Sequence, residues 1–351
     1  MIRPAKPYWA SDQYYEHCQL IMMVTRACQL DCVYCGYDRT LPSMTRETLR
    51  ASVDLLMTAR APLVKLQFFG GEPLLRLDLV REGLDYAEAA AAKAGKTVAF
   101  MITTNTMSLT DALRAELDAR KVTWILSFDG GADAQDEQRP LRAGGSKYGS
   151  ALEQIVRIAK SGAPYLVNMT VSAERAHVVD ENAWLLISAG VHRLSVSYRM
   201  GDRWPPERSR AYFQSLSRLL RRVHLEGIGL SMLNAVGRDE PNIISPMPTV
   251  DCDGMVYVGA VVPSLERLMP TLAPVMRRGY AADIKDFESI RSDRMTVQRL
   301  ALGAAQGTPD EGPLLDAFRM GKMSQSFFDG MVELGLLKAE GRRPPGEVLR
   351  A

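Results

Sequence analysis

The first two thirds of the chain alternate between two hydrophobic patterns. Short apolar runs of strand length are each followed by a longer segment that carries apolar residues on one helical face. The apolar runs predict six strands, over residues 20–24, 63–69, 97–103, 122–128, 165–171 and 191–198. The longer segments predict helices over residues 44–59, 77–92, 111–119, 151–161, 181–189 and 210–224. Residues 130–149 are polar and glycine-rich, which predicts a loop.

Strict alternation of strands and helices is typical of an α/β fold with a parallel sheet and helices on the outside. Right-handed crossovers curl such a sheet into a barrel or a doubly wound sheet. Six units are fewer than the eight of a closed barrel. We therefore predict a core over residues 19–228, preceded by an N-terminal arm over residues 1–18. Functional loops are expected beyond the carboxyl ends of the strands.

The pattern changes after about residue 226. A turn-rich link over residues 241–248 precedes a segment, residues 250–258, that predicts a β-hairpin around Asp253-Gly254. Helices are predicted over residues 283–302, 308–318 and 324–337. We expect residues 229–351 to form an extension of the core. It could cover an open side of the barrel or grip a substrate, and the sequence leaves both roles open.

Composition excludes several classes of protein. The 351 residues are 46% hydrophobic, enough for one large domain or two ordinary ones, and the net charge of +2 does not indicate nucleic-acid binding. We found neither a run of membrane-spanning length nor the apolar segment of a signal peptide, so a cytoplasmic protein is expected. Five cysteines, an odd number, fit a reducing compartment and metal chemistry better than a disulfide framework.

Three of the cysteines lie directly after the first strand. Cys28, Cys32 and Cys35 are separated by three and then two residues, so one loop can bring their thiolates to one metal centre. A structural zinc site takes four ligands, and an iron–sulfur cube normally takes four thiolates. Three thiolates would leave one metal position open, as reactive centres do. Zinc, with His17 as a fourth ligand, and three incidental thiols are the alternatives.

The three cysteines, with Tyr34 before the last one, resemble the cluster motif of the radical S-adenosylmethionine (radical SAM) superfamily. In that family the thiolates hold a [4Fe–4S] cluster, and SAM chelates the fourth iron. The resemblance implies one such cluster, SAM as cofactor, a partial (β/α)6 TIM-like barrel, and Tyr34 among the cofactor-binding residues. It also implies that an electron from the cluster cleaves SAM to methionine and a 5′-deoxyadenosyl radical, which abstracts hydrogen from a substrate C–H bond.

Two strand ends resemble SAM-binding motifs of the same family. The second strand ends in Gly70-Gly71-Glu72, like the GGE motif that binds the SAM amino group. Adjacent glycines allow close approach to the backbone, and a carboxylate accepts hydrogen bonds from an ammonium group. The third strand ends in Thr104-Asn105, like the threonine–asparagine end of many relatives. Thr106 stands where the family often has glycine, so the local turn is expected to differ.

The fourth strand ends in Ser127-Phe128-Asp129-Gly130. It resembles the S-x-D-G signature of peptide- and protein-modifying members, including the anaerobic sulfatase-maturating enzymes. The resemblance implies that Ser127 helps to bind SAM, that Asp129 lines the cavity, and that Asn168 on the fifth strand reaches the SAM ribose. Those relatives carry a histidine before an arginine–proline pair, and none precedes Arg139-Pro140 here. Arg139 is a candidate for a carboxylate contact, and a solvated loop arginine is the alternative.

The hairpin that holds Cys252 resembles the one that opens the auxiliary-cluster extensions called SPASM or Twitch. Those extensions supply several further cysteines, and this chain has only Cys18 and Cys252 left. Two thiolates cannot hold an ordinary cube, so we predict one cluster and a degenerate extension. Cys252 is either a small buried hydrophobe or a catalytic thiol that donates hydrogen to a substrate radical, as in relatives that epimerise peptide residues.

Three functions follow as hypotheses. The first is radical modification of a peptide or protein residue in natural-product maturation, which the S-x-D-G match favours. The second is the same chemistry on a small-molecule intermediate, which the absent histidine, the absent auxiliary clusters and the absence of a recognisable leader-binding domain keep open. The third is a non-catalytic iron–sulfur or zinc protein. For the first two we expect a flavodoxin- or ferredoxin-type electron donor.

Overall fold

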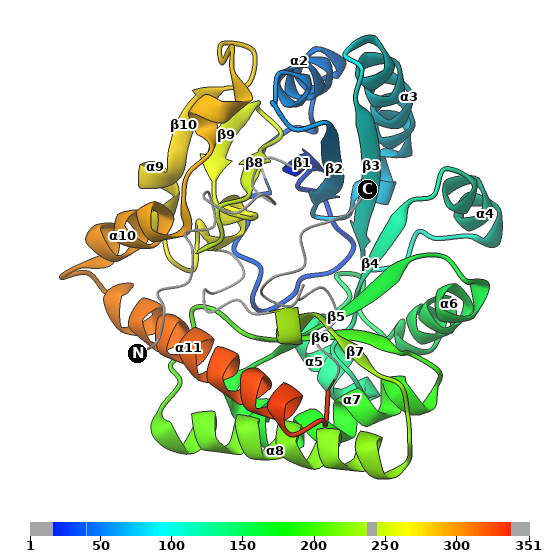
Figure 1. Cartoon of the computed structure of the whole chain (residues 1–351), viewed down its shortest axis with the longest axis vertical. Helices are drawn as coiled ribbons and strands as arrows, with labels where there is room; N and C mark the ends of the chain where they lie inside the picture. The colour runs from blue at the N-terminus through cyan, green and yellow to red at the C-terminus, as the bar shows by residue number, and fades with distance from the viewer. Residues whose placement is uncertain (1–16, 40, 237–243, 338–351) are drawn as a thin grey trace.

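The computed structural model describes residues 17–39, 41–236 and 244–337. The predicted N-terminal arm lies almost wholly outside these residues, as does part of the predicted link at 241–248. Within the described chain one sheet holds ten strands in the order β10-β9-β8-β1-β2-β3-β4-β5-β6-β7. Strands β1 to β7 pair in parallel, and helices surround the curved sheet (Figure 1). The predicted α/β fold with an unclosed barrel is confirmed.

All six predicted strands of the core are present. Their bounds are β1 (His17–Thr25), β2 (Leu63–Gly70), β3 (Thr97–Thr104), β4 (Thr123–Ser127), β5 (Tyr165–Val171) and β6 (Arg193–Tyr198). The helices that follow them are α2 (Arg46–Met57), α3 (Leu77–Lys93), α4 (Asp111–Ala119), α6 (Tyr148–Ser161), α7 (Val179–Ser188) and α8 (Pro206–Leu225). A short edge strand, β7 (Ser231–Met232), follows α8.

The two faces of the core strands differ in exposure. On β5, Val167 and Met169 are completely buried beneath the helices, and Leu166, Asn168 and Thr170 alternate with them as partly exposed residues. Strand alternation puts the second set on the inner face of the curved sheet. In a closed eight-stranded barrel packed side chains fill this interior. Here the inner wall keeps partly exposed polar groups, so it can line a site.

The C-terminal extension continues the sheet beyond β1. Strand β8 (Pro248–Val250) pairs in parallel with β1, with Thr249 opposite Ile21, and antiparallel with β9 (Met255–Val258). The predicted hairpin is confirmed, and Gly254 supplies the positive φ of +88° that its turn requires. Strand β10 (Arg277–Tyr280) completes this edge. The hairpin therefore lies next to the strand that leads into the cysteine loop.

The last helices bridge the open side of the barrel. Helices α10 (Arg294–Ala305) and α11 (Glu311–Glu333) lie between the β10 edge and the β6–β7 edge (Figure 1). Tyr198 donates from its hydroxyl to the Ala317 carbonyl at 3.0 Å, and the Asp316 carboxylate accepts from the Trp204 N–H at 2.9 Å. These bonds fasten α11 to the end of β6, so the extension covers the open side.

Three local predictions were wrong. Residues 130–149 contain helix α5 (Ala132–Gln138), which has no apolar stripe. It is held instead by its buried glutamines, because the side-chain oxygens of Gln135 and Gln138 accept hydrogen bonds from the Asp129 and Ser172 N–H groups. The helix predicted from residue 283 begins only at Arg294, because Phe287 is drawn into the core and its N–H bonds to Thr58. The two helices predicted over 308–318 and 324–337 are one continuous α11, in which the intervening Gly321 is a buried helical residue.

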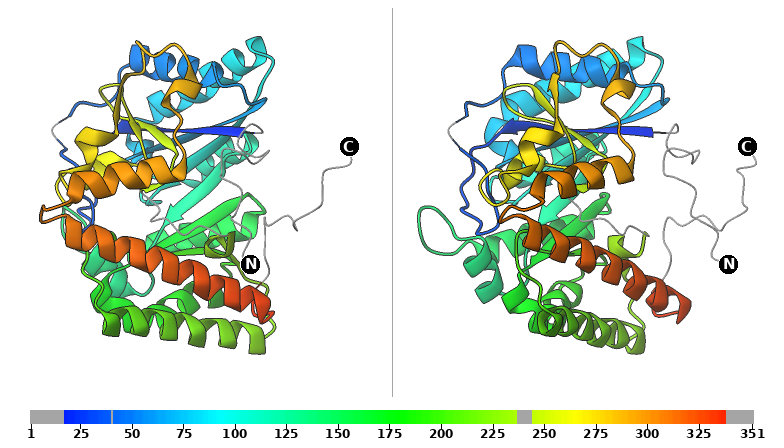
Figure 2. Two further views of the ribbon diagram at one scale, coloured as in Figure 1. Left: turned by 60° about the vertical axis from the view of Figure 1, so that its left-hand side comes forward. Right: turned by 90° about the vertical axis from the view of Figure 1, so that its left-hand side faces the viewer.

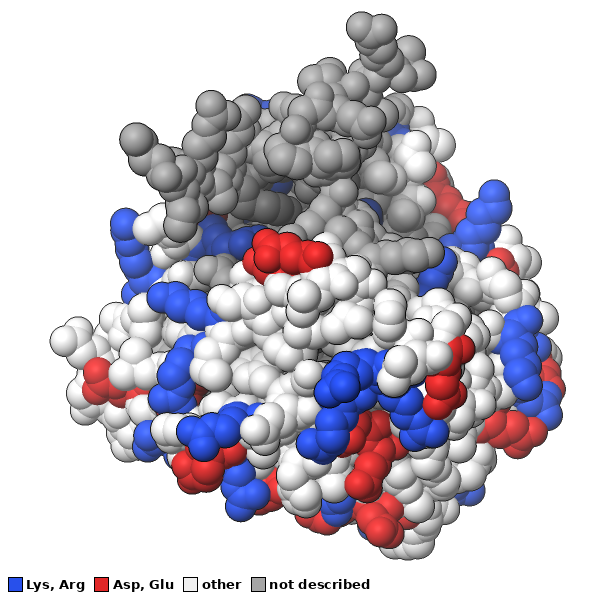
Figure 3. Space-filling model, turned by 60° about the horizontal axis from the view of Figure 1, so that its bottom comes forward, with Lys and Arg blue, Asp and Glu red and all other residues white. Residues whose placement is uncertain are grey.

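Charges are interspersed on the face around α8. Figure 3 shows basic and acidic side chains intermixed there, and Arg218 pairs with Asp180 at 2.7 Å. Arg222 pairs with Glu226 at 3.0 Å and lies over the ring of Trp184. Within the described chain, no helix is both long enough and apolar enough to cross a membrane.

Candidate cofactor site

The cysteine loop, residues 26–38, lies at the end of the barrel toward which β1 runs (Figure 2). Its middle is bonded to the last residue of α5 and to the segment that follows this helix. The Asp31 N–H donates to the Pro140 carbonyl at 2.8 Å, and the Val33 N–H donates to the Gln138 carbonyl at 3.0 Å. These bonds hold the loop over the carboxyl ends of the strands, as the sequence predicted.

The donor set of the loop fits an iron–sulfur cube. Cys28, Cys32 and Cys35 are all partly exposed, and the Cys28 sulfur lies 3.4 Å from the Leu30 N–H and 3.5 Å from the Asn105 amide nitrogen. Amide N–H groups aimed at a thiolate stabilise its charge. Among the described residues, no three His, Cys, Asp or Glu side chains surround a point suited to a single ion. In a cube each thiolate binds a different iron, so wider spacing is expected.

The two glycines at the end of β2 allow the backbone of the cysteine loop to approach closely. A Cβ on Gly70 would lie 2.0 Å from the Thr25 carbonyl oxygen, and one on Gly71 would lie 2.3 Å from that of Ala27. The Gly71 and Glu72 N–H groups donate to the same two carbonyls, at 2.8 and 2.9 Å. The close approach seen here is therefore that of the cysteine loop. Binding of the cofactor by Gly70 and Gly71 remains a prediction.

Glu72 joins the ends of β2 and β3. Its buried carboxylate accepts from the Leu74 N–H at 3.1 Å, the Thr104 hydroxyl at 2.9 Å and the Asn105 N–H at 2.8 Å. A carboxylate has about four acceptor positions, so three of those of Glu72 are occupied within the protein. Burial raises the pKa of Glu72 to about 7, although these three hydrogen bonds lower it. The structure thus brings Glu72, Thr104, Asn105 and Cys28 together, as the separate motifs predicted.

Thr106 adopts the backbone conformation that glycine favours. Its φ is +67°, and its buried hydroxyl has no hydrogen-bond partner among the residues that the structure describes. A β-branched residue at positive φ costs on the order of 1–3 kcal/mol and persists only where its surroundings impose it. The turn after Asn105 is therefore left-handed despite the threonine.

Glu72 is expected to make stability depend on pH. An unfolded glutamate has a pKa of about 4.3, and that of Glu72 is about 7 in the folded protein. The folded state therefore binds this proton more tightly. The stability it contributes is fully present below about pH 4 and is lost as pH rises through about 7, on the order of 3–4 kcal/mol in all.

Chemical denaturation of the cofactor-free protein at about pH 5 and about pH 8 measures this effect. The wild type should lose stability relative to Glu72→Gln, which has no proton to release. Parallel pH profiles for the two proteins would show that Glu72 titrates normally.

Asp129 is the centre of a second buried group. Its carboxylate accepts from the Tyr34 hydroxyl at 2.7 Å, from Arg139 Nε at 2.9 Å and Nη2 at 3.1 Å, and from the Thr170 N–H at 2.9 Å. Arg139 is 7% exposed and lies 5.2 Å from the centre of the Tyr34 ring. The alternative of a solvated arginine is wrong, because Arg139 makes its carboxylate contact with Asp129. Direct cofactor contacts by Tyr34, Asp129 and Arg139 remain predictions.

Ser127 and Asn168 lie side by side on the inner wall. They are opposite each other in the β4–β5 pairing, and both are partly exposed. The Asn168 side-chain oxygen accepts from the Ser197 hydroxyl at 3.2 Å. Their position on the inner wall is compatible with the predicted contacts to SAM, which stay predictions.

Cys252 packs against the cysteine loop. It is 3% exposed, its thiol donates to the Met23 carbonyl at 3.2 Å, and its neighbours include Tyr37 and the partly buried Cys35 and Phe69. Burial raises the pKa of Cys252 to about 12, so the thiol keeps its proton at neutral pH. The packing fits a small buried hydrophobe, and the retained proton fits a hydrogen donor.

Sequence reasoning missed a buried ion cluster behind the loop. Arg26 is 2% exposed and donates to Asp251 at 3.1 Å and to Glu266 at 2.8 and 3.0 Å. Burial alone would lower the pKa of Arg26, and the two carboxylates raise it above its ordinary value. Arg26 adjoins the cysteine motif, but its partners are 225 and 240 residues away, so no sequence pattern linked them.

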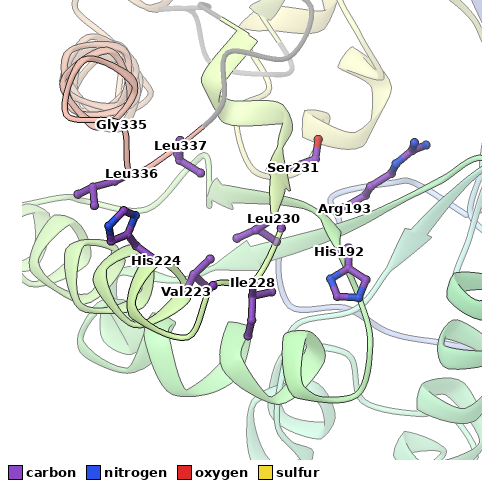
Figure 4. A pocket seen from close by; sticks show the side chains of 12 residues that line it. His192, Arg193, Val223, His224, Ile228, Leu230, Ser231, Gly335, Leu336 and Leu337 are labelled. Atoms are coloured by element: carbon purple, nitrogen blue, oxygen red, sulfur yellow. The ribbon is translucent and has the colours of Figure 1, made fainter.

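A pocket of about 350 Å³ lies apart from this site. His192, Arg193, His224 and Ser231 are among the residues that line it (Figure 4). Strand β6 begins at Arg193, so the pocket is at the amino ends of the strands, whereas the cysteine loop is at the carboxyl ends. No residue predicted to bind the cofactor lines it.

Comparisons with known proteins point to a family. Residues 22–174 match the family model described as the Radical SAM superfamily. An uncharacterized protein of Methanocaldococcus jannaschii is 25% identical over 177 residues, 50% of this chain and 60% of that protein. The chain therefore spans less than two thirds of this relative.

Two solved structures share the fold. One is anSMEcpe with bound AdoMet, with a TM-score of 0.72 and 15% identity over 91% of this chain and 98% of that one. The other is Streptococcus suis SuiB bound to the precursor peptide SuiA, with a TM-score of 0.53 and 12% identity over 79% of this chain and 65% of that one. At these identities the likeness shows the fold alone.

Proposed function

Because residues 22–174 form a radical SAM domain, we propose that this protein is a radical SAM enzyme. The family match supports the predicted cofactors, one [4Fe–4S] cluster and SAM. The observation that carries the proposal is the convergence of Glu72 and Asn105 on Cys28, because three motifs from separate strand ends meet there. A non-catalytic metal protein has no need for this convergence.

Bound together, the cluster and SAM supply a one-electron cleavage that starts radical chemistry on a C–H bond. The residues of this chain hold and orient them. Cys28, Cys32 and Cys35 would bind three irons, with the Asn105 amide donating toward the Cys28 sulfur. Glu72 has one acceptor position left for the SAM ammonium group. Ser127 and Asn168, on the inner wall, would contact the ribose and its surroundings.

We propose a peptide or protein residue as the substrate. The Ser127-Phe128-Asp129-Gly130 strand end supports this choice, and so does the shared fold with SuiB, whose solved structure holds a precursor peptide. A flavodoxin- or ferredoxin-type protein would deliver the electron. The same chemistry on a small molecule is the alternative, because the histidine of the peptide-modifying relatives is absent.

Anaerobic reconstitution with iron and sulfide, followed by reduction in the presence of SAM, tests the proposal. Release of 5′-deoxyadenosine is expected. Uptake of zinc without iron, or intact SAM under strong reductant, would refute the proposed class. Peptides and metabolites from cells with and without the protein then separate the two substrate classes.

Cys252→Ala tests the predicted hydrogen donor. In the proposed step the substrate radical takes a hydrogen atom from the thiol. One electron from the electron donor and one proton from solvent then convert the thiyl radical left behind back to the thiol. Because a thiol proton exchanges with solvent, product made in D2O should carry deuterium on carbon. The variant should lose this label and most of the product. Cys18→Ala, at an equally buried thiol on the far end of β1, should keep both. If Cys252→Ala gave the full yield of product with the deuterium label, Cys252 would be a packing residue and not the hydrogen donor.

A further inference from the structure

The cysteine loop is attached to the C-terminal extension through Arg26. The guanidinium bonds to both oxygens of Glu266 and to both oxygens of Asp251, which are 23% and 1% exposed. It also donates to the Asp38 carbonyl at 2.8 Å and lies 5.8 Å from the centre of the Tyr37 ring. One side chain at the start of the loop thus contacts the end of the loop and two parts of the extension.

A backbone connection lies beside this ion cluster. The Gly36 N–H, one residue after Cys35, donates to the Ser264 carbonyl at 2.8 Å, and the Arg267 N–H returns to the Gly36 carbonyl at 3.1 Å. A Cβ on Gly36 would lie 2.8 Å from the Ser264 oxygen, so the two backbones meet at a distance that only glycine allows. The extension therefore holds the part of the loop that carries Cys35.

The opposite part of the loop has a different support. The Asp31 and Val33 N–H groups bond to residues 138–140 of the core, not to the extension. Residues 30–33 and 35–38 are thus held by two different parts of the chain, and the Cys35 N–H joins them by donating to the Cys32 carbonyl at 3.0 Å. Cys32 belongs to the first part and Cys35 to the second, so the spacing of the thiolates depends on both supports.

We infer that Arg26, through Asp251 and Glu266, is a positioning residue that makes the extension set the place of Cys35 relative to Cys28 and Cys32. The extension has too few cysteines for a cluster of its own. Its role is instead to hold the loop cysteines that would bind the single predicted cluster. In the protein without cofactor, Arg26 would hold residues 35–38 in place. That this placement matters for a bound cluster rests on the proposed function.

The test needs a variant that removes the ion cluster and still folds. Arg26→Met alone would leave two acids without their partner, which is destabilising by itself. The triple variant Arg26→Met, Asp251→Asn, Glu266→Gln removes all three charges at nearly constant shape, and such neutral replacements are often tolerated. Arg26→Lys keeps the charge but cannot form two bidentate pairs. The matched control is Arg218→Met with Asp180→Asn, a two-pronged ion pair between α7 and α8.

Hydrogen exchange of the cofactor-free proteins is the first measurement. The triple variant is expected to exchange the amides of residues 35–38 at least about tenfold faster, and those of residues 30–33 at the wild-type rate. The Arg218 control should change neither. Equal protection of residues 35–38 in the triple variant and the wild type would overturn the inference, and this outcome does not depend on iron binding.

Loss of iron to a chelator and the electron paramagnetic resonance (EPR) spectrum of the reduced cluster are the second measurements. The triple variant should lose iron faster than the wild type and show an altered cluster signal, with Arg26→Lys in between. If the triple variant shows the wild-type spectrum and the wild-type rate of iron loss, Arg26 stabilises the fold but does not position the cluster ligands. A wild type that binds no iron would refute the proposed function and leave the exchange result standing.

Discussion

Asp129→Ala is expected to lower the free energy of unfolding by about 3–5 kcal/mol, because it leaves the buried Arg139 guanidinium without its partner. It also strips the Tyr34 hydroxyl and the Thr170 N–H of their acceptor. For a domain of ordinary stability this is a large part of the total. Chemical denaturation by urea, with the midpoint and slope compared between variant and wild type, measures the loss.

Two controls locate the effect in the buried pair. Glu116→Ala breaks an exposed bidentate ion pair with Arg81 and should lower the free energy of unfolding far less than Asp129→Ala does. The double variant Asp129→Leu, Arg139→Met replaces both charges by apolar groups and should recover much of the loss. If Asp129→Ala were as mild as Glu116→Ala, the carboxylate would not be the anchor of this group.

Replacing any one of Cys28, Cys32 and Cys35 by alanine is expected to abolish cluster binding and SAM cleavage. The loop itself has no fourth cysteine, so each variant keeps two of its thiolates, which are too few to hold a cube in place. Wild-type protein reconstituted without oxygen should contain about four iron per chain, and each variant should retain little. Iron and sulfide analysis with the 5′-deoxyadenosine assay measures both losses.

Cys18→Ala is the matched control for these variants. Cys18 is buried near the start of β1, away from the loop, and its replacement should leave iron content and SAM cleavage at wild-type levels. A variant at Cys28, Cys32 or Cys35 with full iron and turnover would contradict the assignment of that thiolate as a ligand.

The architecture and the cofactor class could be predicted from the sequence because both depend on neighbouring residues. Strand and helix periods are local, and six alternating units already indicate a parallel α/β sheet. The cysteine loop and the strand ends at Glu72, Asn105 and Asp129 are each continuous motifs. Parallel strands place such ends at one edge of the sheet, so their meeting followed from the topology.

Other predictions of secondary structure were wrong because tertiary contacts outweighed the local sequence pattern. Helix α5 has no apolar stripe, and the side chain of Gln135 holds it by accepting from the Asp129 N–H. The predicted break before Ser324 is absent, because α11 runs on through the buried Gly321. A single glycine or glutamine adds nothing to the hydrophobic periodicity of a segment, so its role depends on its tertiary contacts.

The sequence by itself determined the α/β core, the three-cysteine loop and the strand ends that converge on it, since these are written in contiguous residues. Only the tertiary structure decided what holds the loop in place. Arg139 binds Asp129, the glycines after β2 admit the loop backbone, and Arg26 binds two carboxylates more than 200 residues away. Such pairings are set by the approach of β8 to β1 and of α5 to the loop, so no local pattern specifies them.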